Sequence, residues 1–327
     1  MIEFITSGVY TTVQDLGRSG FYHLGVPPSG AADRYSFQIG NMLVGNPVSY
    51  AGLEFRMLGP TLLFHKRAII AIVGAPVDCF VNGISVPMWQ SLEVKAGDQV
   101  SFSFAQQGVC TYMCIAGGIQ LSETLHSRST YMVNKNEKFG GYKAVAGGTL
   151  QFGESAEGLG FYVEKSIPEK YWPSFEKEQH INMVMGLGVY RISDEGVRNF
   201  LDAEWEVGTE SSRVAYRLQG GPVPFEDSPP SFGAGSRSSN IVDIAYPVGV
   251  IIVPNPEEII IMMNDATTGG GFVTIGAVIS SDLDLLNQCR PQTKVRFCAV
   301  TLEQSLMLRR EKQQRLAAVA KYLEVVI

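Results

Sequence analysis

One short apolar run, Ala68-Ile69-Ile70-Ala71-Ile72-Val73, shows the pattern that decides the fold class of this chain. Runs of this length, rich in Val, Ile and Phe and bounded by turn-forming residues, are typical of strands in β-barrels and sandwiches. Similar runs occur at 61–64, 91–94, 99–104, 248–253, 259–263 and 294–300. Because 35 glycines and 16 prolines separate such runs, the sequence predicts a mainly β protein.

Turns and a few short helices complete the prediction. The pair Asn82-Gly83 between short apolar stretches predicts a tight type I′ hairpin. A helix is expected at Asp33–Leu43, since Gly45-Asn46-Pro47 is a stop signal after it. Further helices are predicted at 194–201, with Ser193 as N-cap, at 281–286 and at 303–323.

Length and composition favour two domains, or one large β domain. The chain has 327 residues, of which 45% are apolar and 18% charged, so it can bury a sizeable core. Three weak parallels between the two halves, in the same order, indicate a duplicated β module. The predicted boundaries are an N-terminal module at 1–163, a Pro-containing charged linker at 164–180, a second module at 181–302 and a C-terminal helix at 303–327.

Charge and cysteine content narrow the function classes. The net charge is −6, and the lysines and arginines are scattered, which disfavours binding to nucleic acid or an anionic membrane. No apolar run reaches the roughly 20 residues of a membrane span, and the N-terminal stretch lacks the basic start of a signal peptide. The five cysteines lack CxxC spacing, so reduced thiols and a cytoplasmic location are expected.

Common cofactor motifs are missing from the sequence. The four histidines are far apart, so we expect no metal site. The chain has no GxSxG elbow, no GxxxxGK[ST] loop and no GxGxxG between a strand and a helix. A nucleotide is therefore not expected to bind here through a P-loop or a Rossmann fold.

The Gly/Pro-rich stretch from residue 14 to residue 33 is the first candidate site. Its turns can aim side chains and expose backbone N–H groups toward a carboxylate, a phosphate or a lactam oxygen. The alternative is structural: Asp15 and Arg18 pair with each other, and Asp33 caps the helix that follows. The candidate binding residues of this loop are Gln14, Asp15, Arg18, His23, Ser29 and Asp33.

Three further stretches carry candidate residues. In Ser127-Arg128-Ser129-Thr130, an arginine flanked by hydroxyls suits a carboxylate or phosphate, and an ordinary surface turn is the alternative. In residues 211–217, Arg213 and Arg217 would share one face if helical, or form a solvated basic face. Tyr216 lies between them.

The third stretch, residues 263–271, follows a predicted strand directly. It contains Asp265, Thr268 and three consecutive glycines, Gly269–Gly271. Polar residues at a strand end, beside glycines that let a ligand approach the backbone, indicate a site, and a glycine-rich hairpin turn is the alternative. General-base candidates near these loops are Asp15, Asp33, Glu54, Asp265 and His23.

Several of these stretches together resemble one protein family. The opening signature is Thr11-Thr12-Val13-Gln14-Asp15-Leu16-Gly17-Arg18, followed by Gly25-Val26-Pro27-Pro28-Ser29-Gly30-Ala31 with Asp33. The likeness continues through 43–47, 116–119, 127–130, 212–218 and 265–271. In this combination the chain resembles the KipA-type proteins, also called allophanate hydrolase subunit 2, the C-type subunit of 5-oxoprolinase or the biotin-dependent carboxyltransferase-like domain.

The resemblance implies a fold of two cyclophilin-like β-barrel modules and a subunit that works with a KipI-like partner. The leading hypothesis is ATP-dependent opening of a small lactam, in which 5-oxoproline becomes glutamate. The complex that carries out this reaction would also contain a LamB/YcsF-like component. ATP would be a cofactor of the complex as a whole. Asp15 or Asp265 would orient water or a nucleophile. Substrate would be bound by Gln14, Arg18, His23, Ser29, Asp33, Arg128, Arg213, Tyr216 and Thr268.

Two alternatives follow from the same resemblance. One is a biotin-dependent carboxyltransferase component related to urea carboxylase, and the other is a non-catalytic antagonist of a kinase inhibitor. The family pattern after the second-half strand is Asp-x-Gln-Thr-Thr-Gly-Gly-Tyr-Pro, whereas this chain has Thr267 for Gln, Gly269 for the second Thr, Phe272 for Tyr and Val273 for Pro. The change at Thr267 removes an amide that could bond a lactam or ureido group, which bears on the inherited substrate.

Overall fold

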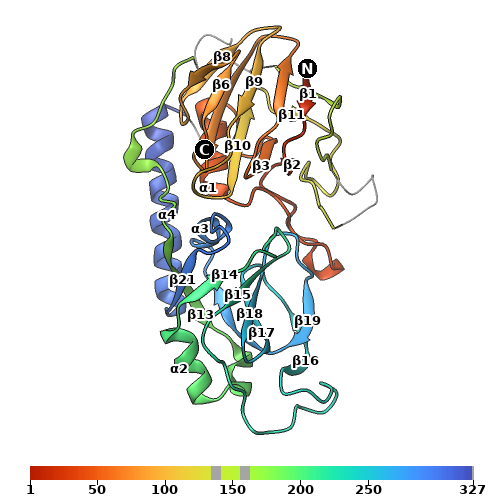
Figure 1. The fold of residues 1–327 in the computed structure, drawn as a ribbon, viewed down its shortest axis with the longest axis vertical. Coiled ribbons are helices and arrows are strands. Elements are labelled where there is room, and N and C mark those ends of the chain that lie inside the picture. Colours follow the sequence, from red (N-terminus) through yellow and green to blue (C-terminus); the bar gives the residue numbers. More distant parts are fainter. Residues whose placement is uncertain (134–140, 155–162, 326–327) are drawn as a thin grey trace. The chain divides into compact units, whose positions relative to one another are not determined.

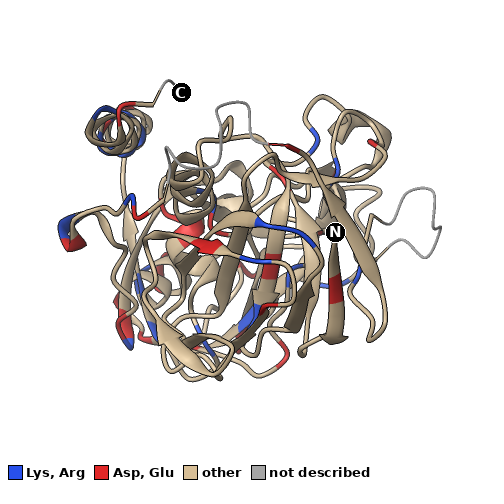
Figure 2. Ribbon diagram, turned by 90° about the horizontal axis from the view of Figure 1, so that it is seen from above, with Lys and Arg blue, Asp and Glu red and all other residues tan. Residues whose placement is uncertain are grey.

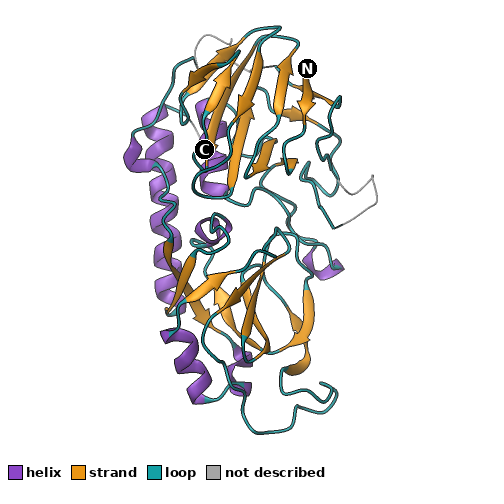
Figure 3. Cartoon of the chain, in the orientation of Figure 1, coloured by secondary structure: helices purple, strands orange, loops and turns teal. Residues whose placement is uncertain are grey.

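The computed structural model describes residues 1–133, 141–154 and 163–325, and the chain divides into two units. The first unit contains Met1–Arg18, Ser29–Phe175 and Gln313–Ile327; the second contains Ser19–Pro28 and Glu176–Lys312. Strands dominate both units (Figure 3). The predicted mainly β fold, with two β modules and few helices, is confirmed.

The first unit is built on two antiparallel sheets (Figure 1). The seven-stranded sheet has the order β11-β12-β1-β4-β9-β6-β7, and the five-stranded sheet has the order β2-β3-β10-β5-β8. The strands are β1 (Ile2–Thr6), β2 (Thr11–Gln14), β3 (Gly52–Arg56), β4 (Thr61–Phe64), β5 (Ala68–Gly74), β6 (Cys79–Val81), β7 (Ile84–Val86), β8 (Ser91–Val94), β9 (Gln99–Phe102), β10 (Cys110–Ile115), β11 (Ile119–Gln120) and β12 (Thr149–Phe152).

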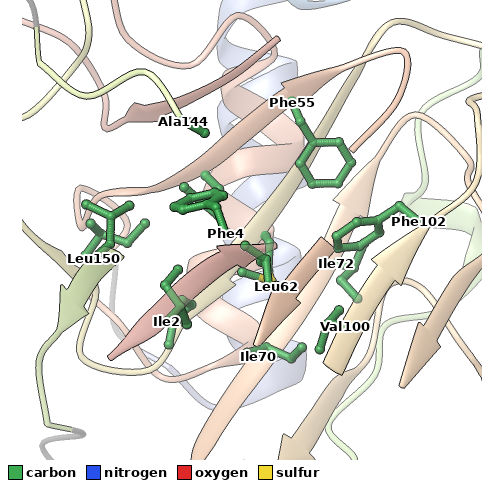
Figure 4. Close-up of a cluster of buried hydrophobic side chains, with 14 of the residues drawn as sticks. Ile2, Phe4, Phe55, Leu62, Ile70, Ile72, Val100, Phe102, Ala144 and Leu150 are labelled. Atoms are coloured by element: carbon green, nitrogen blue, oxygen red, sulfur yellow. The ribbon is translucent and has the colours of Figure 1, made fainter. Parts of the chain in front are cut away.

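The two sheets of the first unit share one apolar core (Figure 4). Ile70 and Ile72 of β5 lie in it with Phe4 of β1 and Leu62 of β4. The alternate residues of β5, such as Val73, belong to a second apolar cluster. Because successive side chains of a strand point to opposite faces, β5 is buried on both sides, which explains its continuous apolar sequence.

Helix α1 (Arg34–Leu43) packs against the second face of the five-stranded sheet. The side chain of Asp33 caps it by accepting a hydrogen bond from the backbone N–H of Ser36 at 2.9 Å. A Cβ at Gly40 would lie 2.8 Å from Cys114 Sγ, so only glycine allows this close approach of helix and sheet. The predicted helix and the interpretation of Asp33 as its cap are confirmed.

The second unit is a closed barrel with the strand order β13-β20-β17-β18-β15-β14-β21. The pair β13 and β21 is parallel, and the other paired neighbours are antiparallel. A two-stranded ribbon, β16-β19, accompanies it. The strands are β13 (Glu178–Met185), β14 (Trp205–Val207), β15 (Ala215–Gln219), β16 (Asn240–Ala245), β17 (Val250–Asn255), β18 (Glu258–Met262), β19 (Gly269–Phe272), β20 (Thr274–Val278) and β21 (Lys294–Ala299).

The remaining helices agree with the sequence-based expectations. Helix α2 (Asp194–Asp202) is capped by Ser193, whose hydroxyl accepts from the Gly196 N–H at 3.1 Å. Helices α3 (Leu283–Asn287) and α4 (Leu302–Leu323) also lie where they are predicted. The last residues of the predicted C-terminal segment, 326–327, lie outside the described residues. Short 3₁₀ turns are η1 (Tyr22–Leu24), η2 (Glu169–Tyr171) and η3 (Leu187–Arg191).

The predicted hairpin turn is present between β6 and β7. Asn82 has a φ of 52° and Gly83 a φ of 78°, so both central residues are left-handed, as a type I′ turn requires. Asn tolerates this conformation better than other residues with a Cβ, and Gly adopts it freely.

One expectation for the second half is wrong. Gly269–Gly271 do not form a loop after a strand; they belong to strand β19, which pairs with β16. A Cβ at Gly270 would lie 2.7 Å from the Tyr246 ring, so the glycine makes room for this ring. Of the two alternatives for residues 211–217, the shared helical face is excluded because Arg217 is in strand β15, and the solvated basic face does not include Arg213, which is buried whereas Arg217 is exposed.

Basic and acidic residues are interspersed along the ribbon (Figure 2). Arg67 contacts Glu93 at 2.5 Å, and Arg217 contacts Glu258 at 2.7 Å, so basic residues have acidic neighbours. Within residues 1–133, 141–154 and 163–325, no helix combines the length and the apolar character needed to cross a membrane.

Candidate functional site

The carboxylate of Asp15 organises a polar cluster at the end of β2 in the first unit. It accepts hydrogen bonds from the Ser127 hydroxyl at 2.7 Å, from the Arg128 backbone N–H at 2.6 Å and from the Gly17 N–H at 2.7 Å, and a further one from the Ser129 hydroxyl. Ser129 Oγ also accepts from the Asp15 N–H at 2.9 Å. Asp15 is 7% exposed. Its carboxylate thus ties residues 127–129 to residues 15–17.

Residues 29–31 pack directly against the backbone of residues 15–17. The Ala31 N–H donates to the Asp15 carbonyl at 2.8 Å. Gly30 has a φ of 83°, and a Cβ there would lie 2.7 Å from the Gly17 nitrogen, so both the conformation and the space require glycine. Ser29 is fully buried in this contact. The Gly/Pro pattern of the loop therefore allows two backbone segments to touch.

Gln14 is fully buried at the last position of β2. Its Nε2 donates to Thr12 Oγ1 at 3.0 Å and to the Thr130 carbonyl at 3.2 Å. Its Oε1 has no hydrogen-bond partner among the residues that the structure describes. Thr130 in turn is held by its N–H, which donates to the Val13 carbonyl at 2.9 Å.

The two arginines of the first unit's candidate set have different environments. Arg18 is 2% exposed, and its guanidinium donates to the Ser129 carbonyl. The Arg128 side chain donates to the Leu121 carbonyl at 2.9 Å and contacts Glu123 at 2.8 Å. Arg128 therefore joins the Asp15 cluster through its backbone N–H, while its charge is engaged by Glu123. The sequence offered a direct pairing of Asp15 with Arg18 as the structural alternative; in the fold, hydrogen bonds tie both residues to the 127–129 segment.

Glu54 and Tyr112 hold the segment that precedes α1. Glu54 Oε2 accepts from the Ala32 N–H at 2.8 Å and from the Tyr112 hydroxyl at 2.9 Å, and that hydroxyl accepts from the Asp33 N–H at 2.7 Å. Burial, reinforced by the negative charge of Glu54, raises the pKa of Tyr112 well above its usual value. The tyrosine therefore stays protonated and donates. Sequence reasoning named Glu54 only as one of several general-base candidates and missed Tyr112.

In the second unit, Asp265 and Arg213 form a buried ion pair. Arg213 Nε donates to Asp265 Oδ2 at 2.9 Å, and Nη2 donates to Oδ1 at 3.2 Å. The side chains are 1% exposed for Arg213 and 0% for Asp265. The geometry is bidentate, which matches the planar fork of guanidinium to a carboxylate. Both charges are thereby compensated inside the unit.

The other candidate residues of the second unit differ in how deeply they are buried. Tyr216 is fully buried, and its hydroxyl donates to the Asn287 carbonyl at 3.0 Å. His23 is exposed in η1, and the neighbouring Tyr22 hydroxyl donates to the Tyr246 carbonyl. Thr268 is half-buried, and its carbonyl accepts from the Tyr246 N–H at 2.9 Å.

Sequence reasoning could have found part of the missing network. Ser127 and Ser129 were noted only as hydroxyls beside Arg128, yet they supply two of the donors to Asp15. The Ser-x-Ser spacing signals only the short-range hydrogen bond from the Ser129 N–H to Ser127 Oγ at 3.0 Å, and no local signal pairs either serine with Asp15. Among the described residues, no three His, Cys, Asp or Glu side chains gather as a metal site.

Comparison with known proteins places this arrangement in one family. A family model described as the carboxyltransferase domain, subdomain A and B, matches residues 24–299. The chain is 30% identical over 314 residues to urea amidolyase of Saccharomyces cerevisiae, an alignment that covers 94% of this chain but only 17% of that protein. It is 27% identical over 314 residues to the C-type subunit of 5-oxoprolinase of Escherichia coli, with 96% of each chain covered.

A solved structure supports the same relation. The urea carboxylase of Kluyveromyces lactis superposes on all of this chain, and on 30% of its own, with a TM-score of 0.91 and 28% sequence identity. The resemblance drawn from the sequence signatures is confirmed. This chain therefore belongs to the family of the carboxyltransferase domain, subdomains A and B.

Proposed function

We propose that the chain is one component of an ATP-dependent 5-oxoprolinase-type amidohydrolase, which opens the lactam 5-oxoproline to glutamate together with a KipI-like partner. The observation that carries the proposal is the match to the C-type subunit of 5-oxoprolinase from two bacteria. The alignments cover 96% of this chain and 96% of each relative, at 27% and 26% identity. A LamB/YcsF-like protein is the third expected component of the complex.

The chemistry of the first-unit cluster supports this substrate class. Hydrolysis of a lactam requires that the amide be held in place while its carbonyl is activated, and ATP supplies the activation energy as a co-substrate of the complex. No residue of this chain is assigned to ATP. The buried Arg18 guanidinium supplies a positive charge that favours a ligand carboxylate, such as that of 5-oxoproline.

The two carboxylates predicted to be catalytic have protein partners, which favours positioning roles. Asp15 accepts from Ser127, Arg128 and Gly17 and would act by fixing the loop geometry. Asp265 would act by compensating Arg213. A direct role for either carboxylate in orienting water remains the alternative within the proposal. So does substrate binding by the remaining candidates, which are His23, Ser29, Asp33, Arg128, Tyr216 and Thr268.

The test is reconstitution of the chain with its KipI-like and LamB/YcsF-like partners, with glutamate release from 5-oxoproline and ATP consumption measured together. We expect turnover that needs all components. Asp15→Asn should lower it by at least about tenfold, because the carboxylate loses charge-assisted hydrogen bonds worth about 1.5–3 kcal/mol each. Asp78→Asn, an exposed position in the same unit, is the matched control. Full turnover in Asp15→Asn would remove Asp15 from the proposal; absence of turnover in the wild-type complex would reject the proposed function.

Biotin-dependent carboxyl transfer to urea is less well supported, since the urea-metabolising relatives contain this region as a small part of much longer chains. The same preparation separates it: carboxylation of urea in the presence of a biotin carboxylase, with no glutamate release, would favour transfer. Tight binding of the KipI-like partner without either reaction would favour a non-catalytic regulator.

A further inference from the structure

The carbonyl oxygen of the Gln14 side chain combines a fixed orientation with incomplete hydrogen bonding. The side-chain amide cannot be flipped without loss of a hydrogen bond, because the Thr130 carbonyl, 3.2 Å from Nε2, requires a donor opposite it. Nε2 therefore faces Thr130 and Thr12, and Oε1 faces away from both.

The lack of a hydrogen-bond partner for Oε1 is unusual for a buried amide oxygen. Gln14 is 0% exposed, and Oε1 has no partner among the described residues. Buried polar atoms are nearly always hydrogen-bonded, and a lone one marks a functional position or an ordered water. A neutral carbonyl oxygen accepts only, so it favours an N–H or O–H group and disfavours another carbonyl or a carboxylate.

The surroundings hold the Gln14 side chain in place. Asp15, the next residue, has its carboxylate engaged by residues 17 and 127–129. Gln14 and Arg18 donate to the consecutive carbonyls of Thr130 and Ser129, so one short segment anchors both. An acceptor and a positive charge are thus fixed on the same segment.

We propose that Gln14 Oε1 accepts a hydrogen bond from the amide N–H of the ligand, and that the site selects lactams and ureido compounds with a free N–H. This inference rests on the proposed function and names the group by which that site recognises its substrate. Oε1 is closed to solvent, so the ligand reaches it only after the part of the chain that covers it moves, while the Gln14 side chain stays in place.

The test compares two probes that differ in one atom, 5-oxoproline and its lactone analogue, in which the ring N–H is replaced by oxygen. Binding to the reconstituted complex is measured for the wild type and for Gln14→Met, which keeps the length of the side chain and removes the acceptor. Gln151→Met, at an exposed position of β12, is the matched control. We expect Gln14→Met to weaken 5-oxoproline binding about tenfold and to change lactone binding less than about twofold.

Other results overturn the inference. Equal weakening of both probes would make Gln14 a purely structural residue, and no change for either would assign Oε1 to an ordered water. If Gln14→Met fails to fold, the wild-type complex still decides: it should prefer the lactam over the lactone about tenfold or more, and equal affinity would refute the proposal.

The failure of this inference can be told from failure of the proposed function. Turnover of 5-oxoproline with unchanged probe selectivity in Gln14→Met rejects the inference alone. A wild-type complex that binds neither probe but binds urea rejects the 5-oxoprolinase assignment, and Gln14→Met should then weaken urea binding about tenfold. A complex that binds none of the three rejects both.

Discussion

Removal of the Asp265 charge should destabilise the second unit strongly, because it would leave Arg213 as an uncompensated charge inside the barrel. The two side chains are 0% and 1% exposed and joined by hydrogen bonds of 2.9 and 3.2 Å. Breaking a buried ion pair of this kind costs about 3–5 kcal/mol. For a unit of this size, that corresponds to a fall in melting temperature of about 10 °C.

The perturbation is Asp265→Asn, which keeps the shape of the side chain and removes its charge. The double variant Arg213→Met with Asp265→Leu should recover most of the loss, since apolar replacement of a whole buried pair is often neutral. Salt should change the difference little, because a buried pair is weakly screened.

The assay is denaturant unfolding followed by tryptophan fluorescence. Trp205 is fully buried in the second unit and donates to the Phe200 carbonyl at 3.0 Å. Trp89 and Trp172, the other two tryptophans, belong to the first unit. A background with both changed to Phe makes Trp205 the reporter of the second unit. A loss below about 1 kcal/mol in Asp265→Asn would refute the structural role, and lost turnover in such a stable variant would identify Asp265 as catalytic.

Three further predictions concern the backbone and the ionisable groups. Gly30→Ala should cost more stability than Gly97→Ala: both residues have positive φ, but a Cβ at Gly30 would meet Gly17 at 2.7 Å, whereas at Gly97 it meets nothing within 4 Å; equal melting temperatures would contradict the close approach. Burial raises the pKa of Tyr35 to about 12, so its contribution to stability is complete below about pH 10 and should be lost as the pH rises from about 10 to 12; Tyr35→Phe should flatten that fall, and an unchanged pH profile would argue against it. At about pH 8 a thiol reagent should label Cys298 first, since it is partly exposed and the other four cysteines are buried, with burial raising the pKa of Cys79 to about 12; rapid labelling of all five would contradict the packing.

Local sequence signals predicted the elements of the fold well. Short apolar runs became strands such as β4 and β8 with the expected bounds, because runs of that length between turn formers have few alternatives. Asp33 and Ser193 marked helix starts, since their side chains accept from backbone N–H groups near the start of the helix. These signals act over a few residues, and the sequence contains all that they need.

Long-range pairing was the part that the sequence did not reveal. Asp15 binds the Ser127 hydroxyl 112 residues away, and Asp265 binds an arginine 52 residues away. No local pattern specifies such partners. Gly269–Gly271 misled for a related reason: three glycines usually mark a loop, but here they belong to strand β19, and Gly270 makes room for the Tyr246 ring.

The candidate site likewise combines segments that local sequence signals identified with long-range contacts that they did not. The sequence identified the Gln14–Asp33 loop and the Ser127–Thr130 segment separately, and the fold joins them through Asp15. It also assigned ligand roles to Asp33 and Tyr216, whose side chains have structural partners, Ser36 and Asn287. The identity of a polar loop residue is the same whether it caps a helix or contacts a ligand. Its burial and its hydrogen-bond partners therefore had to come from the structure.

Glutamate release from 5-oxoproline decides whether this chain is a component of a 5-oxoprolinase. It should be measured with ATP and the two partner proteins, in the presence and in the absence of this chain. We expect glutamate formation coupled to ATP consumption only when the chain is present. Equal glutamate release without the chain, or none with all three components folded and assembled, would contradict this expectation.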